Sequence, residues 1–194
     1  MFRARTAQNV LILVGLQWSN RVLGVVTKVV LARLLFPDDF GIFALAAGLV
    51  GFIATFGNFG LDYAIIQKGA KATQEDYDVG MSLRIVISVG LFIATVLVAG
   101  PWASLFRSPL VTPTTQVLAL IYLVIPLSFV PGTRLSAELR YRAIAVPNVL
   151  SQVVNSVLAI AMAFLGYGVW ALVIPMVVAQ AGAVVAYSVM RRWR

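Results

Sequence analysis

The sequence contains no cysteine and no histidine. The absence of cysteine excludes a disulfide framework and thiol chemistry. The absence of both residue types removes the usual zinc ligands, and without histidine the chain lacks the commonest general base. We therefore expect no catalytic residues, no metal site and no cofactor, which argues against an enzyme.

Charge is scarce as well. Only 11% of the residues are charged, against about a quarter in a soluble domain, whereas 61% are hydrophobic and the mean hydropathy is +0.95. A lipid bilayer is the solvent that fits this composition. The formal net charge is +8, but the basic residues lie between apolar runs and form no stripe. They indicate membrane topology and contact with membrane lipid rather than with nucleic acid.

Runs without charge mark the candidate transmembrane helices, because a charge at mid-bilayer costs about 2.5 to 3.5 kcal/mol on insertion scales. Each helix needs roughly 20 apolar residues. The last such run is long enough for two helices, and Gly166-Tyr167-Gly168 in its middle predicts a turn. The expected spans are 10–36, 40–66, 80–106, 114–133, 145–165 and 169–190. We therefore expect an all-α integral membrane protein, with residues 1–194 forming a single domain of six transmembrane helices.

The segments between these spans predict helix starts and orientation. Thr73 and Asp76 match a capping box, so the helix leading into the third span should begin near Gln74. The N-terminus, the second loop, the fourth loop and the C-terminal tail carry ten Lys and Arg residues, whereas the other three loops carry two. Basic loops stay in the cytoplasm, so we expect both termini there. The first span should be retained and not cleaved as a signal peptide.

Polar residues of the first span share one narrow face, because their offsets of 0, 4, 7 and 11 fit a helix that turns 100° per residue. They are Gln17, Arg21, Gly24 and Lys28. Arg21 lies eleven residues, roughly 16 Å, from the start of its span, which is too deep for comfortable snorkelling. We therefore expect this face to line a hydrated cavity enclosed by protein.

The second span repeats the same offsets with Gly51, Thr55, Asn58 and Asp62. A short turn at residues 37–39 predicts that the first two spans are antiparallel neighbours, which would bring Asp62 near the level of Gln17 and Arg21. Gly41, Ala44 and Gly48 continue this face outward. Small residues at this spacing more often serve close helix packing than substrate contact. Asp62 can equally be read as the partner that neutralises Arg21.

A third polar group lies in the cytoplasmic half of the fifth span. Asn148, Gln152 and Asn155 follow one another at helical spacing. Intramembrane ionisable residues are functional candidates by default. With Arg21 and Lys28 set against Asp62, the cavity is net positive, which suits an anionic ligand such as a pyrophosphate head group. The candidate substrate-binding residues are Arg21, Lys28, Gln17, Asn58, Asp62, Asn148, Gln152 and Asn155.

Three stretches of the chain resemble the N-terminal half of an oligosaccharide flippase of the Wzx type. This family is the polysaccharide-transporter branch of the multidrug/oligosaccharidyl-lipid/polysaccharide (MOP) flippase superfamily. Residues 31–41 (LARLLFPDDFG) are similar to the family's junction between its first two helices, and residues 59–67 (FGLDYAIIQ) are similar to the end of its second helix. The third stretch runs from residues 139–142 (LRYR) to residues 166–173 (GYGVWALV).

The resemblance implies a fold of two helical lobes around a central cavity, of which this chain is one. It implies transport of an undecaprenyl-diphosphate-linked oligosaccharide outward across the bacterial inner membrane for surface polysaccharide or lipopolysaccharide synthesis. It also implies that Arg21 and Lys28 meet the anionic part of this lipid-linked glycan. Because members of the family have twelve or more helices, we expect a second lobe or a second chain to complete the cavity.

Three other functions compete with the flippase. An ion-coupled drug or metabolite exporter of the same superfamily would use Asp62 as its proton or sodium site. A membrane-bound glycan enzyme should present acidic or histidine catalytic residues on a sizeable loop, whereas the expected outer loops here are short. A non-transporting membrane scaffold predicts that neutralising Arg21 and Lys28 leaves function intact.

Overall fold

The computed structural model describes residues 2–57, 73–129, 132 and 141–192, and it describes 2–14, 16–17, 141–144 and 188–192 by their backbone alone. Within these ranges the chain is helical and has no strand. The elements are α1 (Phe2–Leu34), α2 (Pro37–Thr55), α4 (Gln74–Leu105), α5 (Val111–Val124), the short 3-10 helix η2 (Ile125–Ser128), α7 (Tyr141–Phe164) and α8 (Trp170–Arg192).

Several of these helices suit a bilayer. In the part of the chain that the structure describes, five segments are long and apolar enough to cross a membrane, judged by length and composition. They are Pro37–Thr55, Gln74–Leu105, Val111–Ser128, Ala145–Phe164 and Trp170–Tyr187. The expectation of an all-α, multi-pass membrane protein is thereby confirmed.

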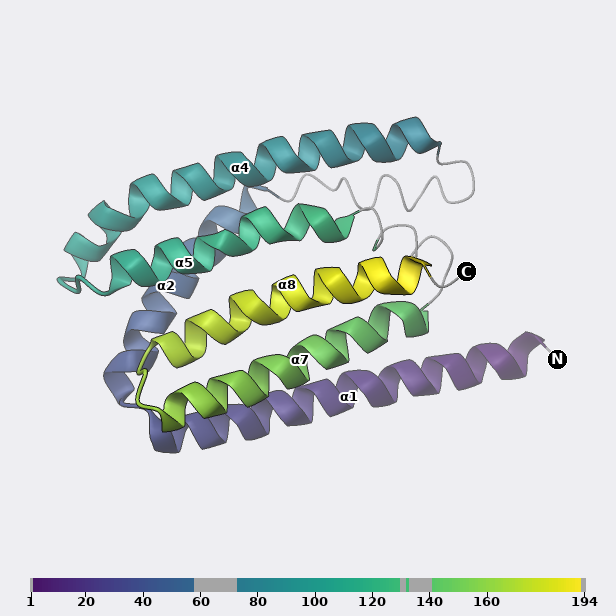
Figure 1. Cartoon of the computed structure of the whole chain (residues 1–194), viewed down its shortest axis with the longest axis horizontal. Coiled ribbons are helices and arrows are strands. Elements are labelled where there is room, and N and C mark those ends of the chain that lie inside the picture. Colours follow the sequence, from purple (N-terminus) through teal and green to yellow (C-terminus); the bar gives the residue numbers. More distant parts are fainter. Residues whose placement is uncertain (1, 58–72, 130–131, 133–140, 193–194) are drawn as a thin grey trace.

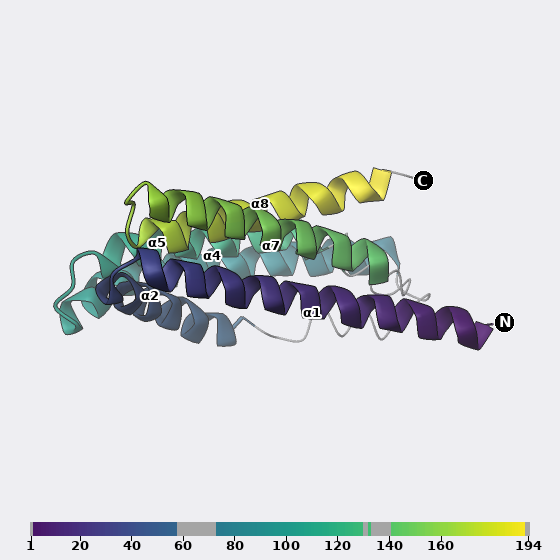
Figure 2. The same cartoon turned by 90° about the horizontal axis from the view of Figure 1, so that it is seen from below.

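Five helices form one layer, in the spatial order α1, α7, α8, α5 and α4, and each packs against the next (Figure 1). Helix α2 does not join this layer. It crosses one side of it, packing on α5 and α4 (Figure 2). Helix α1 begins and α8 ends at the same end of the bundle (Figure 1).

Short turns connect the helices at the opposite end. Helix α7 ends in a Schellman motif, in which Tyr167 N–H bonds the Met162 carbonyl at 3.1 Å and Gly166 adopts φ +78°. Helix α4 ends in the same pattern, with Ser108 N–H on the Ala103 carbonyl at 3.2 Å. There Arg107 takes the left-handed position, with φ +52°, which is uncommon for a residue other than glycine.

The expected capping box at the start of α4 is confirmed. The Thr73 hydroxyl accepts a hydrogen bond from Asp76 N–H at 3.3 Å, and the Asp76 carboxylate accepts one from Thr73 N–H at 3.0 Å. These two bonds satisfy backbone donors that have no partner within the helix. The helix therefore begins at Gln74, as the sequence predicts.

Two turns of the bundle touch at Asp39. Its carboxylate accepts a hydrogen bond from Phe36 N–H at 3.1 Å and so caps the start of α2. The same carboxylate lies beside Gly168 in the turn between α7 and α8, where a β-carbon would come within 2.9 Å of its oxygen. Gly168 also has φ +56°, so this position requires glycine on two counts.

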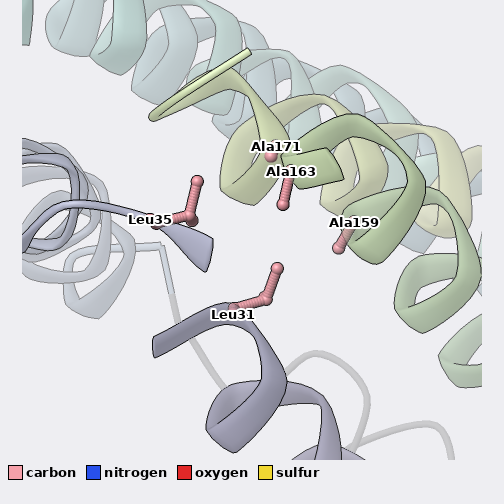
Figure 3. Packing of buried hydrophobic residues seen from close by; sticks show 5 residues of the cluster. All are labelled: Leu31, Leu35, Ala159, Ala163 and Ala171. Atoms are coloured by element: carbon pink, nitrogen blue, oxygen red, sulfur yellow. The ribbon is translucent and has the colours of Figure 1, made fainter. Parts of the chain in front are cut away.

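Small side chains bring the helices close together. Near the turns, Leu31 and Leu35 of α1 pack against Ala159 and Ala163 of α7 and Ala171 of α8 (Figure 3). Ala46 of α2 packs with Leu118 of α5, with Val169 just before α8 and with Val173 of α8. Alanine at such positions lets backbones approach closely, which is how helices associate in lipid.

The expectation that α1 and α2 pair as antiparallel neighbours is wrong for the described residues. Helix α1 packs along α7, while α2 packs on α5 and α4. The turn at Pro37 is short, but it redirects the chain across the layer instead of back along α1 (Figure 2). The short connection determines where α2 begins. The apolar face of α2 then determines which helices it packs against. The buried side chains of α2 are Ala46, Leu49 and Ile53.

Candidate functional site

The site is built on the contact between α1 and α7. Thr27 donates a hydrogen bond to the buried Ser156 hydroxyl at 2.8 Å, and the Gln152 amide nitrogen lies 3.7 Å from where a β-carbon on Gly24 would be. Leu31 packs with Ala159 further along. The offsets of these pairs are 129, 128 and 128 residues, so the two helices run parallel and keep nearly the same register (Figure 1).

The basic residues of α1 lie on one flank of this contact. Relative to Thr27, Gly24 lies about 60° around the helix, and Lys28 and Arg21 lie about 40° and 60° further in the same direction. The side chains of Arg21 and Lys28 are exposed. Exposed apolar side chains begin next to Arg21, because Val25 and Trp18 lie about 40° and 60° beyond it. The others are on the opposite flank of the helix, and they are Val22, Val26 and Val29.

The amides of α7 border the same flank. Gln152 lies about 40° from Ser156, toward Gly24, and Asn155 lies about 100° from Ser156 in that direction. The exposed residues Val153 and Val157 face the opposite side of α7. The structure therefore brings the basic face of α1 beside the amide face of α7. We call this group the polar face; its members are Arg21, Gly24, Lys28, Asn148, Gln152 and Asn155.

Helix α8 contacts one end of the polar face through Tyr187. The Tyr187 hydroxyl donates to the Asn148 Oδ1 at 3.1 Å, and the Tyr187 ring is buried. Val173 lies on the same side of α8 as Tyr187 and packs against Ala46 of α2. Helix α2 therefore crosses the layer on the side that carries the polar face.

The register places the two cations along this contact. Ala145, the first residue of α7 whose side chain is described, lies about level with position 17 of α1. Arg21 and Lys28 follow about 6 Å and 16 Å further along α1, toward its turn into α2. The depth of each cation in the membrane stays a prediction.

The polar face carries positive charge without described counter-charge. Among the residues that the structure covers, no carboxylate pairs with Arg21 or Lys28. The Arg21 guanidinium lies 5.8 Å from the centre of the exposed Trp18 ring, a cation–π distance. Tryptophan side chains are common at membrane interfaces.

The other candidate residues are less fully placed. Gln17 lies on α1, and nothing beyond its backbone is described. Asn58 and Asp62 lie outside the described residues, so their proximity to Arg21 stays a prediction.

The small-residue face of α2 differs from expectation. Gly41, Ala44, Gly48, Gly51 and Thr55 are all exposed, and a β-carbon on Gly41, Gly48 or Gly51 would meet nothing within 4 Å. These glycines thus make no close helix contact within the described chain.

Sequence reasoning missed three polar residues at this site. Thr27 and Ser156 are buried and bond each other, and Tyr187 orients Asn148. A hydroxyl or phenol inside an apolar run is the available signal, because a polar side chain in lipid needs a partner. Asn20 is a fourth: its Oδ1 is buried and accepts no hydrogen bond from any described residue.

Comparison with known proteins decides the family. A sequence profile described as "Polysaccharide biosynthesis protein" matches residues 30–194, which is most of the chain.

The chain belongs to the polysaccharide biosynthesis protein family.

Two relatives show how much of a family member this chain represents. It is 30% identical over 153 residues to the succinoglycan biosynthesis transport protein ExoT of Rhizobium meliloti, a match that covers 76% of the chain and 30% of the relative. It is 29% identical over 105 residues to an uncharacterized membrane protein in the cps region of Klebsiella pneumoniae, covering 54% of the chain and 21% of that protein. The chain thus spans less than a third of either relative. No solved structure matches it.

Proposed function

We propose that this member of the polysaccharide biosynthesis protein family transports a lipid-linked anionic oligosaccharide from the cytoplasmic to the outer leaflet of the bacterial inner membrane. The observation that carries the proposal is the polar face, which presents two cations and three amides beside each other on α1 and α7. Cations and amide donors bind phosphate oxygens, and amides also bind sugar hydroxyls. A relative named as a succinoglycan biosynthesis transport protein supports the same assignment.

The substrate is proposed to be anionic because of the charge at the polar face. The described carboxylates of α2 and α4 lie near the starts of these helices, in the first turn at Asp38, Asp39, Glu75 and Asp76 and just after it at Asp78. Lys28 belongs to the expected first transmembrane span and lies on the helix that packs along α7, where an isolated cation is costly. A mobile anion such as a lipid diphosphate would lower this cost while it passes.

A second lobe or a second chain is proposed to enclose the polar face. Without a cover, Lys28 would face acyl chains or require water in the bilayer. The chain spans 30% of the length of its succinoglycan-transport relative, so most of that relative's length is available for such a cover. The small-residue face of α2 lies on the same side of the layer and suits close helix packing. The proposed orientation has both termini in the cytoplasm.

Replacing Lys28 with Gln in the producing organism tests the proposal. We expect surface polysaccharide to fall at least ~10-fold and the lipid-linked intermediate to accumulate, because a charge-assisted hydrogen bond contributes about 1.5 to 3 kcal/mol. Arg33→Gln is the matched control. Arg33 is an exposed basic residue of the same helix, about 120° around from Arg21, so its replacement should leave output unchanged.

Normal polysaccharide output from Lys28→Gln, at a normal level of protein in the membrane, would contradict the transporter. It would favour the membrane scaffold, which requires no buried cation.

A further inference from the structure

Two turns at the same end of the bundle share one backbone motif. In the turn after α7, Gly166 N–H bonds the Ala163 carbonyl at 3.0 Å, and Gly166 has φ +78°. In the turn after α4, Arg107 N–H bonds the Ser104 carbonyl at 3.2 Å, and Arg107 has φ +52°. Arg107 and Gly166 therefore occupy the same position, the left-handed residue that ends the helix.

Arginine is disfavoured at this position on two independent grounds. The left-handed conformation strains a residue that has a β-carbon, whereas glycine adopts it freely. The turn also lies at the end of the bundle that we expect to be outside, where loops contain few basic residues (Figure 1). Arg107 is exposed, and no carboxylate among the described residues pairs with it. Within the described chain, no ion pair offsets these two costs.

The turn around Arg107 lies at the edge of the bilayer. The apolar segments Gln74–Leu105 and Val111–Ser128 end and begin on either side of it. Leu105 and Leu110, which flank the turn, are 70% and 50% exposed. Apolar side chains at this depth contact acyl chains, and an arginine between them extends its guanidinium to the level of the lipid phosphates. The guanidinium and the two leucines thus match the two parts of a phospholipid.

The base of this turn is held firmly by its neighbours. The rings of Trp102 and Phe106 pack edge to face, with their centroids 5.0 Å apart. Trp102 Nε1 also donates a hydrogen bond to the Leu45 carbonyl of α2 at 3.1 Å. These contacts tie the residue before Arg107 to a second helix. A ligand therefore meets a guanidinium on a fixed base, which reduces the entropy lost on binding.

We infer that Arg107 forms a binding site for the phosphate of an anionic glycerophospholipid. The lipid belongs to the leaflet at the turn end of the bundle, which is the outer leaflet in the proposed orientation. A guanidinium binds two phosphate oxygens at once, while Leu105 and Leu110 contact acyl chains. The bound lipid anchors the α4–α5 hairpin at a fixed height in the membrane. This site is separate from the polar face and does not depend on the proposed transport.

The twin turns allow a local test of lipid selectivity. Single cysteines replace Leu105 and Phe164, which lie two residues before Arg107 and Gly166 and are 70% and 71% exposed. Each carries an apolar bimane fluorophore, and the protein is placed in phosphatidylcholine vesicles. Brominated phosphatidylglycerol then replaces a growing share of the lipid. Bromine quenches only a nearby fluorophore, so comparison with brominated phosphatidylcholine gives the local preference between the two lipids.

We expect the two labels to differ. The Leu105 label should report a preference for phosphatidylglycerol of about fivefold, as one arginine near an anionic surface predicts. The Phe164 label should report none, because its turn has glycine in place of arginine. Arg107→Gln should abolish the preference at the Leu105 label. Arg33→Gln is the matched control, since it removes the same charge from an exposed residue in the last turn of α1 and should leave the preference intact.

Arg107→Gly separates lipid binding from a structural role. This variant should lose the preference for phosphatidylglycerol as Arg107→Gln does. Its melting temperature in lipid-free detergent should be at least that of the unmodified protein, because glycine relieves the left-handed strain. A lower melting temperature would mean that Arg107 supports the protein itself, which would overturn the inference.

Three lipid results would also overturn the site. A preference that survives Arg107→Gln, or one of equal size at the Leu105 and Phe164 labels, would indicate general attraction of anionic lipid by a chain of net charge +8. Absence of any preference at the Leu105 label in the unmodified protein would mean that Arg107 binds no anionic lipid. None of these results bears on transport, which the Lys28→Gln experiment tests separately.

Discussion

At the scale of single residues, Tyr187 determines how Asn148 can be used. The phenol reaches across from α8 and donates to the Asn148 Oδ1 at 3.1 Å, while its ring is buried between the helices. A free amide in this position could rotate and present either its oxygen or its nitrogen. The bond to Tyr187 makes the nitrogen the group that faces a ligand, which is why a residue outside the polar face affects the chemistry of that face.

Tyr187→Phe should therefore weaken binding of a lipid diphosphate about threefold to tenfold, since one neutral hydrogen bond contributes about 0.5 to 1.5 kcal/mol. The ring stays in place, so the melting temperature should change little. Equilibrium binding of a radiolabelled polyprenyl diphosphate carrying one sugar, the probe, to the protein in nanodiscs measures the effect.

Asn148→Asp is the informative companion to this variant. It keeps an acceptor for Tyr187 but replaces the amide donor with a negative charge, so it should bind less probe than Tyr187→Phe does. Stronger or unchanged binding in Asn148→Asp would show that the donor assignment is wrong.

At the scale of helices and turns, the two best-defined sequence motifs meet in space. The Pro37-Asp38-Asp39 turn and the Gly166-Tyr167-Gly168 turn are far apart in sequence, yet the Asp39 carboxylate lies against Gly168. The carboxylate is held there because it also caps α2 through Phe36 N–H. The contact ties the crossing helix α2 to the α7–α8 hairpin and so fixes one end of the bundle.

Gly168→Ala should lower the free energy of unfolding by about 2 kcal/mol, since a left-handed conformation costs an L-residue roughly 1 to 2 kcal/mol and the new methyl group meets the Asp39 carboxylate. In an Asp39→Ala background the added cost should fall to about 1 kcal/mol, because only the backbone strain remains. Thermal unfolding in detergent, analysed as a double-mutant cycle, measures the difference.

Gly166→Ala is the matched control for this cycle. Gly166 also has a positive φ, but a β-carbon there would meet nothing within 4 Å. Its cost should be the same with and without Asp39. Equal costs for Gly168→Ala in both backgrounds would mean that the carboxylate moves aside freely.

The sequence predicts these helices well because the signals that start and end each helix lie within a few residues of one another in the chain. Charge-free runs, a capping box at Thr73 and a glycine pair at residues 166–168 are all short-range signals, and helices form close to where those signals put them. Which helices pack together is not local information. The pattern of α1 gives the direction of its polar residues, but its partner α7 is decided by complementary small residues more than a hundred positions away.

The candidate site was predictable to the same extent. Helical spacing grouped Arg21 with Lys28 and Asn148 with Gln152 and Asn155, and the structure brings these two groups side by side. Their roles in binding stay a prediction. Depth could not be derived from α1 alone, because a basic amphipathic helix gives no edge from which to measure. The depths of Arg21 and Lys28 therefore stay a prediction.

At the scale of the whole molecule, the turns divide into two sets. The turns after α1, α4 and α7 gather at one end, while α1 begins and α8 ends at the other (Figure 1). The sequence assigns the excess of Lys and Arg to the two termini and to the second and fourth loops, so the end where α1 begins and α8 ends is expected to be cytoplasmic. The count of basic residues therefore predicts which end of the bundle faces the cytoplasm.

Single cysteines should report this orientation directly, because the sequence contains none of its own. Tyr167→Cys, at the exposed turn between α7 and α8, should react with a membrane-impermeant maleimide in intact spheroplasts. Glu75→Cys, in the first turn of α4, should react only after the membrane is permeabilised. Mass shift on a gel measures both, and the reverse pattern would place the termini outside.

The pairing of α1 with α7 also bears on how the protein is made. Thr27 and its partner Ser156 are 129 residues apart, and ribosomes add about 5 to 20 residues per second, so α1 emerges some 6 to 26 s before the helix it packs against. During this interval the Thr27 hydroxyl has a partner in its own helix, the Leu23 carbonyl at 2.7 Å. Arg21 also has a contact within α1, the Trp18 ring at 5.8 Å, whereas Lys28 has no described partner there. We therefore expect the nascent helix to keep Lys28 near water or lipid phosphates until the polar face is covered.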